Sequence, residues 1–465
     1  MSTQVQALVV GAGISGLTAA YALKKSGIIT ILLEASSRPG GVIQSIQRDS
    51  FLVECGPQSF SGNASIASVC KDLGLLDQRI FADPKAPRYV LLNGKLQSVP
   101  MGPGLLVSPF VGGSTFFAML RDLLGSSRPP EPDESIADFV RRKFTPTFLD
   151  RLIGPFVSGV YAGDPEKLSL RAAFPIVHEA ETVKASLFRG AIAMRKAQRT
   201  KRGEGPLEKP TFESFRDGNE TLVRALAKDL DDQLFCDVEV TAVDALDPSL
   251  DATAARFHLT LHTPRGEERI EAERLVLACS PSAAGRILAR LNPHFESELT
   301  AIESVPIGLV SLGYRAADVA HGLDGFGFLV PRSSGLNVLG TVWNSSLFPG
   351  RAPENHALLT SFVGGATNPA IVQKSPEELV SIVHREISSV LSIRNTPVFS
   401  NVTIWPQAIP QYNLGHTARL AAVEKLRSAF PGLHFAGNYL RGPAIGACVE
   451  QALKIADEIR VSFAN

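Results

Sequence analysis

A glycine-rich turn near the start of the chain constrains the fold more than any other feature of the sequence. Residues 11–16 read Gly-Ala-Gly-Ile-Ser-Gly and follow a short apolar run at residues 5–10. A helix-like segment at residues 17–26 and a second apolar run at residues 28–33 come next. This order predicts a βαβ unit, in which the first glycine turns the chain, the second admits a pyrophosphate and the third allows close packing.

A carboxylate and a second glycine pair extend this predicted dinucleotide site. Glu34 ends the second predicted strand, where a carboxylate can accept hydrogen bonds from both ribose hydroxyls. Arg38 adds a charge complementary to phosphate, and two adjacent glycines let the main chain pass close to a long ligand. The residues expected at the dinucleotide are Gly11, Ala12, Gly13, Ile14, Ser15, Gly16, Glu34, Ala35, Arg38, Gly40 and Gly41.

Length, charge and cysteine usage limit the class of protein. The 465 residues predict two to four domains. Because 46 Lys and Arg balance 46 Asp and Glu, no net field attracts nucleic acid, and we expect no such partner. Five scattered cysteines without a CxxC motif, and the lack of an export signal before the first strand, predict a cytoplasmic protein with reduced thiols. His258 and His262 lie in a strand-like run without further ligands, so we expect no metal site.

The rest of the chain suggests a discontinuous arrangement. Short β runs at residues 274–278 and 433–436 fit a nucleotide domain built from both ends of the chain. Residues 96–120 carry no charge, but their prolines and glycines break any long helix. They predict either a buried, loop-rich segment or an apolar surface that enters one membrane leaflet through Leu105, Leu106 and Phe110.

Two charged segments lie between these runs. Residues 133–144 begin with acidic residues, end with basic ones and place apolar residues at helical spacing, which predicts a capped amphipathic helix. Residues 184–209 have an excess of positive charge. This basic run predicts a solvated loop, with attraction to anionic headgroups or to an anionic substrate as the alternatives.

Several strings in the sequence resemble one known family. Residues 34–41, together with 434–438 and 442–450, resemble the two flavin segments of the FAD-dependent amine oxidase superfamily. The strings that narrow the resemblance to the protoporphyrinogen oxidase family, over nearly the whole chain, are residues 54–57, 133–139, 158–169, 325–331 and 362–365. The resemblance implies bound FAD. The further FAD contacts that it implies are Val42, Gly56, Pro57, Gln58, Ser59, Val240, Trp405, Gly437, Asn438, Ala444, Ile445 and Val449.

The resemblance also implies substrate contacts. Arg88 matches an arginine that grips a substrate propionate, although an arginine on a surface hairpin is the alternative. Leu329, Val342 and Phe362 match residues that sandwich the tetrapyrrole, where simple core packing is the alternative. Gly159 matches a glycine near the reactive edge of the flavin, where the lack of a Cβ leaves room for a macrocycle. Gly159 and Arg88 are therefore the expected catalytic residues. Gln58 stands where the family often has Asn, which puts a proton-accepting role for that side chain in doubt.

The activity that the resemblance implies is an oxidation. An FAD-dependent oxidase would convert protoporphyrinogen IX into protoporphyrin IX in haem or tetrapyrrole synthesis, with O2 as acceptor and H2O2 as product. Oxidation of coproporphyrinogen III by the same chemistry is one alternative. A flavin amine oxidase is a second, although we identify neither an aromatic cage nor a lysine for it. A flavin-bearing binding protein is a third.

We therefore expect an α/β fold with three parts. A Rossmann-like FAD-binding domain would comprise residues 1–84, 210–300 and 405–465. Residues 95–209 would form an inserted helical, membrane-facing domain, and residues 85–94 and 301–404 a substrate domain with a mixed β-sheet. A poorly soluble porphyrinogen favours a cytoplasmic protein bound peripherally to the inner face of a membrane. The sequence leaves a homodimer open.

Overall fold

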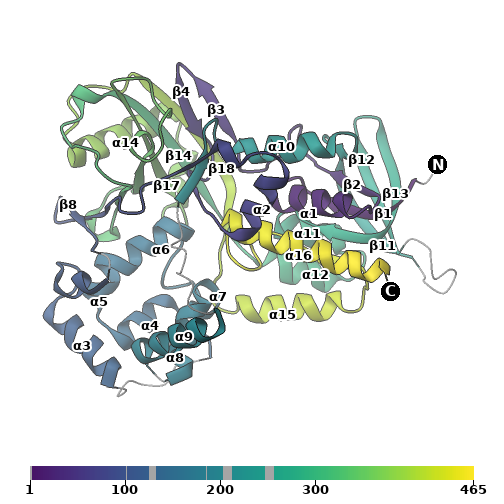
Figure 1. Cartoon of the computed structure of the whole chain (residues 1–465), viewed down its shortest axis with the longest axis horizontal. Helices are drawn as coiled ribbons and strands as arrows, with labels where there is room; N and C mark the ends of the chain where they lie inside the picture. The colour runs from purple at the N-terminus through teal and green to yellow at the C-terminus, as the bar shows by residue number, and fades with distance from the viewer. Residues whose placement is uncertain are drawn as a thin grey trace.

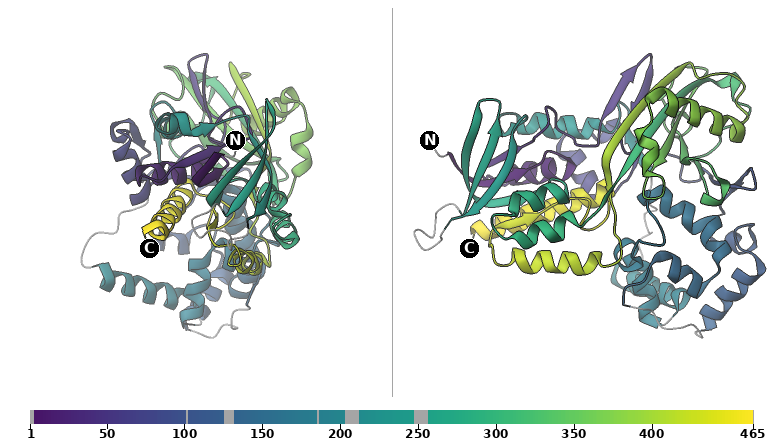
Figure 2. Two further views of the ribbon diagram at one scale, coloured as in Figure 1. Left: turned by 90° about the vertical axis from the view of Figure 1, so that its right-hand side faces the viewer. Right: turned by 180° about the vertical axis from the view of Figure 1, so that it is seen from behind.

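The structure is a computed structural model that describes residues 3–100, 102–124, 132–184, 186–202, 212–246 and 256–464. It is a mixed α/β fold with two large sheets and a group of helices below the sheet that contains β14, β17 and β18 (Figure 1). Both ends of the chain lie at the end of the first sheet that faces away from the second (Figure 2).

The first sheet contains the predicted βαβ unit. The strand β1 pairs in parallel with β2 on one side and with β13 on the other, and β19 pairs in parallel with β13. The runs expected at residues 274–278 and 433–436 therefore join the sheet of the N-terminal strand. The strands, in the order β10-β2-β1-β13-β12-β11 with β19 beside β13, are β1 (Thr3–Val10), β2 (Thr30–Leu33), β10 (Leu234–Phe235), β11 (Glu239–Ala245), β12 (Phe257–Thr263), β13 (Gly266–Leu277) and β19 (Leu433–Phe435).

Helices cover both faces of this sheet because its strands are apolar on both sides. Val9 and Leu32 face a core that includes α1, α2, α10 and α16. Leu8 and Leu33 face the opposite core, which includes α11, α12 and α15. These helices are α1 (Ile14–Lys25), α2 (Ala64–Asp72), α10 (Glu220–Leu230), α11 (Pro281–Leu288), α12 (Pro293–Thr300), α15 (His416–Arg427) and α16 (Ile445–Ala464).

The second sheet is covered by a helix on one face. Leu379, Val383 and Ile387 of α14 (Pro376–Leu391) pack with buried strand residues such as Val310 and Leu359. The strands, in the order β18-β14-β17-β16-β15-β7-β8, are β7 (Arg88–Leu92), β8 (Lys95–Ser98), β14 (Ser304–Arg315), β15 (Gly327–Leu329), β16 (Val338–Trp343), β17 (His356–Gly364) and β18 (Phe399–Pro410). The helical domain was expected to begin at residue 95, but residues 95–98 form β8, which pairs with β7 in this sheet. The substrate domain was expected to end at residue 404, and β18 continues past it to Pro410.

Two small sheets lie close to the large ones. One pairs β3 with β4, and the other has the order β5-β9-β6. Their strands are β3 (Ser45–Arg48), β4 (Phe51–Glu54), β5 (Phe60–Ser61), β6 (Arg79–Phe81) and β9 (Phe212–Phe215).

Helices dominate residues 102–202. The amphipathic helix expected at residues 133–144 is α4, whose first turn is capped by Ser135 through a hydrogen bond from the Asp138 amide. The remaining helices, including short 3-10 (η2) and π (η3) segments, are η2 (Gly102–Val107), α3 (Gly113–Leu124), α4 (Ile136–Lys143), α5 (Pro146–Phe148), η3 (Leu149–Ile153), α6 (Gly154–Tyr161), α7 (Leu170–Ala173), α8 (Pro175–Lys184) and α9 (Leu187–Arg202). None of the helices within the described ranges is both long enough and apolar enough to cross a bilayer.

One expectation for this region is wrong. The basic run was expected as a solvated loop, but its residues 187–202 form α9; Lys209 lies outside the described residues, as do the side chains of Arg199, Lys201 and Arg202. Of the two alternatives for residues 96–120, Phe110 follows the buried one, because it is fully buried with Val90 and Leu92 of β7, whereas Leu106 is exposed.

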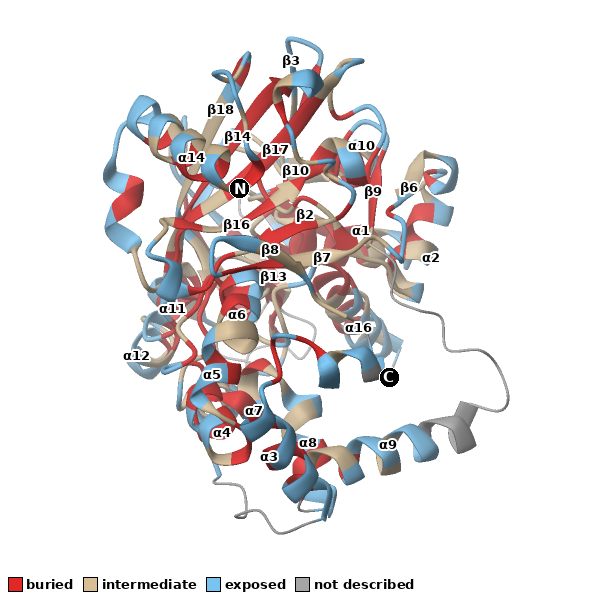
Figure 3. Ribbon diagram, turned by 90° about the vertical axis from the view of Figure 1, so that its left-hand side faces the viewer, coloured by how far each residue is buried: buried red, intermediate tan, exposed pale blue. Residues whose placement is uncertain are grey.

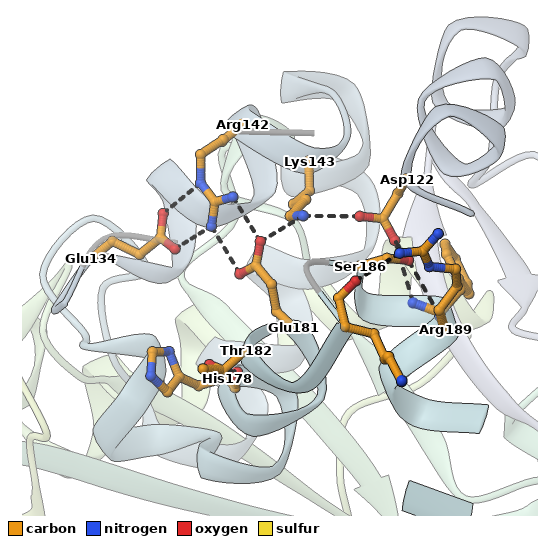
Figure 4. A network of polar contacts seen from close by, with 11 residues as sticks. Asp122, Glu134, Arg142, Lys143, His178, Glu181, Thr182, Ser186 and Arg189 are labelled. Atoms are coloured by element: carbon orange, nitrogen blue, oxygen red, sulfur yellow. Dashed lines mark hydrogen bonds and ion pairs between the residues drawn. The ribbon is translucent and has the colours of Figure 1, made fainter. Parts of the chain in front are cut away.

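A buried ionic network fixes the helices of this region (Figure 4). The Lys143 ammonium lies 2.9 Å from Asp122 Oδ1 on α3 and 2.6 Å from Glu181 Oε1 on α8. Arg142 pairs with Glu134 and places Nη1 2.7 Å from Glu181 Oε1. Burial opposes ionisation of Asp122, but the hydrogen bonds from Lys143, the Phe188 amide and Ser186 keep its pKa below the ordinary value. The network therefore holds the polar side of α3 inward.

Candidate cofactor and substrate site

The turn at residues 11–16 has the geometry that a bound diphosphate requires. Gly11 adopts a φ of 99°, and a Cβ on Gly16 would lie 1.9 Å from the Gly11 carbonyl oxygen. Apart from Gly13 and its two neighbours in the chain, no described residue has an atom within 4 Å of the Cβ position of Gly13. Because α1 begins at Ile14, its unpaired amides lie beside this open space and can bind an anion.

Glu34 lies at the end of β2, as predicted, and its carboxylate faces the turn. Oε2 accepts a hydrogen bond from the Ala12 amide at 2.6 Å, and Oε1 accepts two from Ser36, from the amide at 2.9 Å and the hydroxyl at 2.6 Å. An ionised carboxylate has about four acceptor positions, so one remains for a ribose hydroxyl. Ala35 follows on the exposed loop.

The glycine pair brings a second loop against the turn. Gly40 and Gly41 have φ values of 106° and 56°, and a Cβ on Gly41 would lie 3.6 Å from the Gly13 Cα. The Gly40 amide donates to the Ala12 carbonyl at 2.7 Å. Arg38 donates to the Gly41 carbonyl at 2.7 Å, so the arginine also orders the loop that it belongs to.

The segment before β11 lies against the loop that follows β2. The Asp237 amide donates to the Ser36 carbonyl at 3.1 Å, and the Val238 amide donates to the Glu34 carbonyl at 2.9 Å. Val240 is buried in the core that contains Leu33. Val240, which was expected to contact FAD, therefore lies in the same region as Glu34, which was expected at the ribose.

The second expected flavin segment lies beside the first. Ile445 and Val449 of α16 pack in one core with Ile14 of α1, so the two helices begin side by side. The Tyr412 hydroxyl donates to the Asn438 carbonyl at 2.6 Å and accepts from the Gly442 amide at 2.6 Å. Gly437 has a φ of 154° and, with the exposed Ala444, belongs to this loop before α16.

The segment at residues 54–59 joins this group through close backbone contacts. A Cβ on Gly56 would lie 1.9 Å from the Val42 carbonyl oxygen. Trp405 Nε1 donates to the Cys55 carbonyl at 2.6 Å. The Pro57 carbonyl accepts from Asn219, and Ser59 is half-buried beyond it.

Gln58 is buried, and its amide is occupied by protein groups. Nε2 donates to the carbonyls of Glu54 and Gly56, at 3.1 and 2.8 Å, and Oε1 accepts from Asn344 at 2.6 Å. The side chain therefore fixes the local backbone, which agrees with the doubt about a proton-accepting role.

The expected substrate residues share one face of the second sheet. Arg88 lies opposite Gly327, which lies opposite Val342. Leu329 lies opposite Gly340, which lies opposite Phe362. Residues paired across neighbouring strands point to the same side, so all four side chains lie on the face away from α14. We call Leu329, Val342 and Phe362 the apolar wall; all three are half-buried.

Arg88 stands at one end of the apolar wall. Its guanidinium carbon lies 5.3 Å from the ring centre of Phe212 and 5.6 Å from that of Phe326. No carboxylate within the described ranges forms an ion pair with it. The residue does lie on the hairpin of β7 and β8, but it is half-buried between aromatic rings, which leaves a cation free to bind a carboxylate.

Gly159 lies on α6, which packs against the apolar wall. A Cβ there would lie 2.6 Å from Leu329 Cδ2. Gly159 itself is exposed and shares a helix face with the exposed Phe156 and Val160. The space that this glycine leaves is therefore taken in part by the end of the Leu329 side chain.

Three residues of this region were not found by sequence reasoning. Asn344, Arg351 and Tyr412 each hold a segment that was predicted to contact the cofactor. None lies in a recognisable motif, and each acts on a partner far away in the sequence.

Comparisons with known proteins identify the family of the chain. A family model described as flavin containing amine oxidoreductase matches residues 14–460. Protoporphyrinogen oxidase of rice chloroplasts (Oryza sativa subsp. japonica) is 38% identical, covering 97% of this chain and 87% of the relative. Coproporphyrinogen III oxidase of Bacillus subtilis is 30% identical, covering 96% and 95%. A crystal structure from Exiguobacterium sp. 255-15 covers 99% of both chains at 24% identity with a TM-score of 0.80.

Proposed function

The chain belongs to the flavin-containing amine oxidoreductase family and is an FAD-dependent oxidoreductase related to the protoporphyrinogen oxidases, and we propose that it oxidises protoporphyrinogen IX to protoporphyrin IX. The observation that carries the proposal is the apolar wall with the cation of Arg88 at its end, which no carboxylate of the described residues pairs with. A flat apolar macrocycle with carboxylates fits such a surface.

The residues present fit FAD. The open space above Gly13, the start of α1 and the remaining acceptor position of Glu34 suit a diphosphate and a ribose. The segments at residues 40–42, 56–59 and 437–445 would line the rest of the cofactor, with Val240 near the adenine and Trp405 near the flavin ring. When bound, FAD supplies the hydride acceptor and O2 restores its oxidised form, so that one protoporphyrinogen and three O2 give one protoporphyrin and three H2O2.

The protein's own task is placement. Arg88 would grip one propionate with two parallel hydrogen bonds, and the apolar wall would hold the ring while excluding water. Gly159 would let the substrate approach α6 closely. No side chain needs to act as a general base in this scheme.

Coproporphyrinogen III is the competing substrate because relatives of both names match the chain over most of its length. Four propionates would call for more cations than Arg88 at the wall. The test is a parallel assay of the purified FAD-loaded protein with each porphyrinogen, following porphyrin fluorescence. A higher kcat/KM for the dicarboxylate supports the proposal; a higher value for the tetracarboxylate overturns the substrate and retains the flavin chemistry.

We further propose that α3 contacts a membrane surface. Thr115 and Asp122 of this helix are buried together with Ala118 and Met119, whereas its large apolar side chains other than Met119 are exposed, along with Ser114 and Arg121. Figure 3 colours the ribbon of α3 by this burial. The exposed apolar residues of α3 are Phe116, Phe117, Leu120, Leu123 and Leu124. A soluble helix normally has the opposite pattern, so an apolar phase on the outer side accounts for it. Arg189 and Arg195 on the adjacent α9 are exposed and suit anionic headgroups.

The membrane proposal has a direct test. A variant with Phe117, Leu120 and Leu124 changed to Ser should lose flotation with vesicles that contain anionic lipid and keep its porphyrinogen oxidation in detergent. A control variant with the exposed Val398, just before β18, and Val461, on α16, changed to Ser should float like the parent. Equal flotation of both variants would contradict the proposal.

A further inference from the structure

A buried arginine links the part of the chain that carries the apolar wall to the segment expected at the flavin. Arg351 follows α13 (Asn344–Leu347), which itself follows β16, and its side chain is 1% exposed. Nη2 lies 3.3 Å from Glu54 Oε1 and donates to Ser214 Oγ at 2.5 Å. Further donations reach the carbonyls of Phe215 and Arg216, at 3.1 and 3.3 Å.

These contacts close into a ring of hydrogen bonds around Asn219. Glu54 Oε1 accepts from the Asn219 amide at 2.9 Å, and the Ser214 hydroxyl donates to Asn219 Oδ1 at 2.7 Å. Asn219 Nδ2 then donates to the Pro57 carbonyl at 2.7 Å. Arg351 therefore acts on the backbone at Pro57 through two intermediaries, Glu54 and Ser214.

A second link runs parallel to the first. Asn344, two residues after Val342 of the apolar wall, donates from Nδ2 to Gln58 Oε1 at 2.6 Å, and both residues are buried. Gln58 in turn donates to the Glu54 and Gly56 carbonyls. Two residues of the segment 344–351 thus hold both ends of the segment 54–58.

Stability alone does not explain this arrangement. Burial raises the pKa of Glu54 to about 7, in spite of Arg351 and the hydrogen bonds from Ser45 and Asn219. Arg351 Nε and Asn344 Oδ1 are buried without a hydrogen-bond partner among the described residues. Apolar side chains of similar volume would often pack here at equal or lower free energy. What the polar groups provide is a fixed geometry between two segments.

We propose that Arg351 and Asn344 are positioning residues that set the distance between the segment 54–58, expected at the flavin, and the apolar wall. The inference rests on the proposed function, because it assigns flavin contact to one segment and substrate contact to the other. Neither residue touches the substrate in this assignment. Both act by holding Gly56, Pro57 and Gln58 in place.

The experiment compares paired substitutions with a matched control. Arg351→Met combined with Glu54→Gln removes the ion pair without leaving one buried charge alone. The control, Arg79→Met with Glu213→Gln, removes another buried pair that joins β6 to β9; within the described ranges neither side chain forms a hydrogen bond or ion pair with the segment 54–58. Thermal unfolding, FAD dissociation, the visible flavin spectrum, kcat and KM are measured for the holoenzyme of each.

If Arg351 is a positioning residue, the two double variants should differ in kcat and in their flavin spectra. The Arg351/Glu54 double variant should lose about tenfold to a hundredfold in kcat, because a misplacement of about 1 Å has an effect of this size, and its flavin spectrum should shift. The control should keep kcat within about twofold whatever its Tm. A double variant with the parent's kcat and flavin spectrum would overturn the proposal, because the ion pair would then be structural only.

Asn344→Leu provides an independent readout. It removes the hydrogen bond to Gln58 and keeps a side chain of similar volume, so the flavin spectrum should shift and FAD should dissociate several-fold faster. These two measurements need no substrate, and they remain valid if porphyrinogens are not oxidised. An unchanged spectrum and dissociation rate would contradict the role of Asn344.

Discussion

Replacing Gly159 by Ala should damage catalysis while it leaves the fold and the cofactor intact. The new Cβ would lie 2.6 Å from Leu329 Cδ2 and 3.5 Å from Cδ1. Carbon atoms in contact are ordinarily 3.5 to 4.0 Å apart, so Leu329 must move by about 1 Å. The clashing atoms are at the end of the Leu329 side chain, which can move more easily than the backbone of α6. The substitution should therefore displace Leu329, a residue of the apolar wall.

The size of the effect follows from that displacement. Overpacking costs about 1 to 3 kcal/mol, and the better helix propensity of Ala offsets up to about 1 kcal/mol of it. A misfit of about one methylene in an apolar pocket costs 1 to 3 kcal/mol in transition-state binding, roughly 10-fold to 200-fold in kcat/KM. We therefore expect kcat/KM for the porphyrinogen to fall at least tenfold, with unchanged FAD content.

The assay includes a rescue and a control. Gly159→Ala combined with Leu329→Val, which shortens the clashing side chain, should recover much of the lost kcat/KM. Gly163→Ala creates a similar clash, 2.5 Å from Leu168 Cδ1 and 2.7 Å from Gln411 Oε1, with no residue of the apolar wall among the clashing atoms, and should lower Tm with little effect on kcat/KM. The reasoning is refuted if Gly159→Ala has the parent's kcat/KM, or if Gly163→Ala loses as much.

Four further substitutions test the site. Arg88→Ala should remove a charge-assisted contact of about 1.5 to 3 kcal/mol and raise KM about tenfold or more with FAD retained; unchanged kinetics would return Arg88 to the hairpin surface. Gly16→Ala would place a Cβ 1.9 Å from the Gly11 carbonyl oxygen, so the purified protein should contain little FAD, and a full complement of FAD would contradict the role of the turn. Tyr412→Phe removes both hydrogen bonds to the loop at 438–442 and should release FAD about tenfold faster, whereas the control Tyr161→Phe should not. Burial raises the pKa of Glu54 from 4.5 to about 7, so the folded state binds the carboxyl proton more tightly than the unfolded state does. This proton binding contributes about 3 kcal/mol to the free energy of unfolding at low pH, and the contribution is lost as pH rises from about 4.5 to 7. Denaturant unfolding of Glu54→Gln should lack this slope, and an identical pH dependence in parent and variant would refute the assignment.

The cofactor half of the site is readable from sequence because it depends on local backbone geometry. Positive φ values at Gly11, Gly40 and Gly41 and the close approach of Gly16 to Gly11 leave glycine as the residue that fits. The strands beside this turn are short apolar runs, so their pattern predicts them as well. The parallel pairing of β1, β13 and β19 confirms that both ends of the chain build the first sheet.

The remaining features depend on contacts that no local pattern records. Asn344 and Arg351 act on residues 286 and 297 positions earlier in the chain, and their neighbours form no motif. The basic run was predicted as a loop because of its charge, yet Leu187 and Phe188 at the start of α9 pack against the apolar core of the neighbouring helices. The uncharged run around Phe110 left a buried segment and an apolar surface as alternatives, and contacts with Val90 and Leu92 of β7, which no local pattern predicts, bury this side chain.

The most direct test of the proposed function is an anaerobic mixing experiment with the FAD-loaded protein and protoporphyrinogen IX, followed by admission of O2. We expect the absorbance of oxidised flavin to disappear on mixing and to return with O2, and we expect about three H2O2 for each protoporphyrin formed. A flavin that stays oxidised with protoporphyrinogen IX, under conditions in which a chemical reductant bleaches it, would contradict the proposed function.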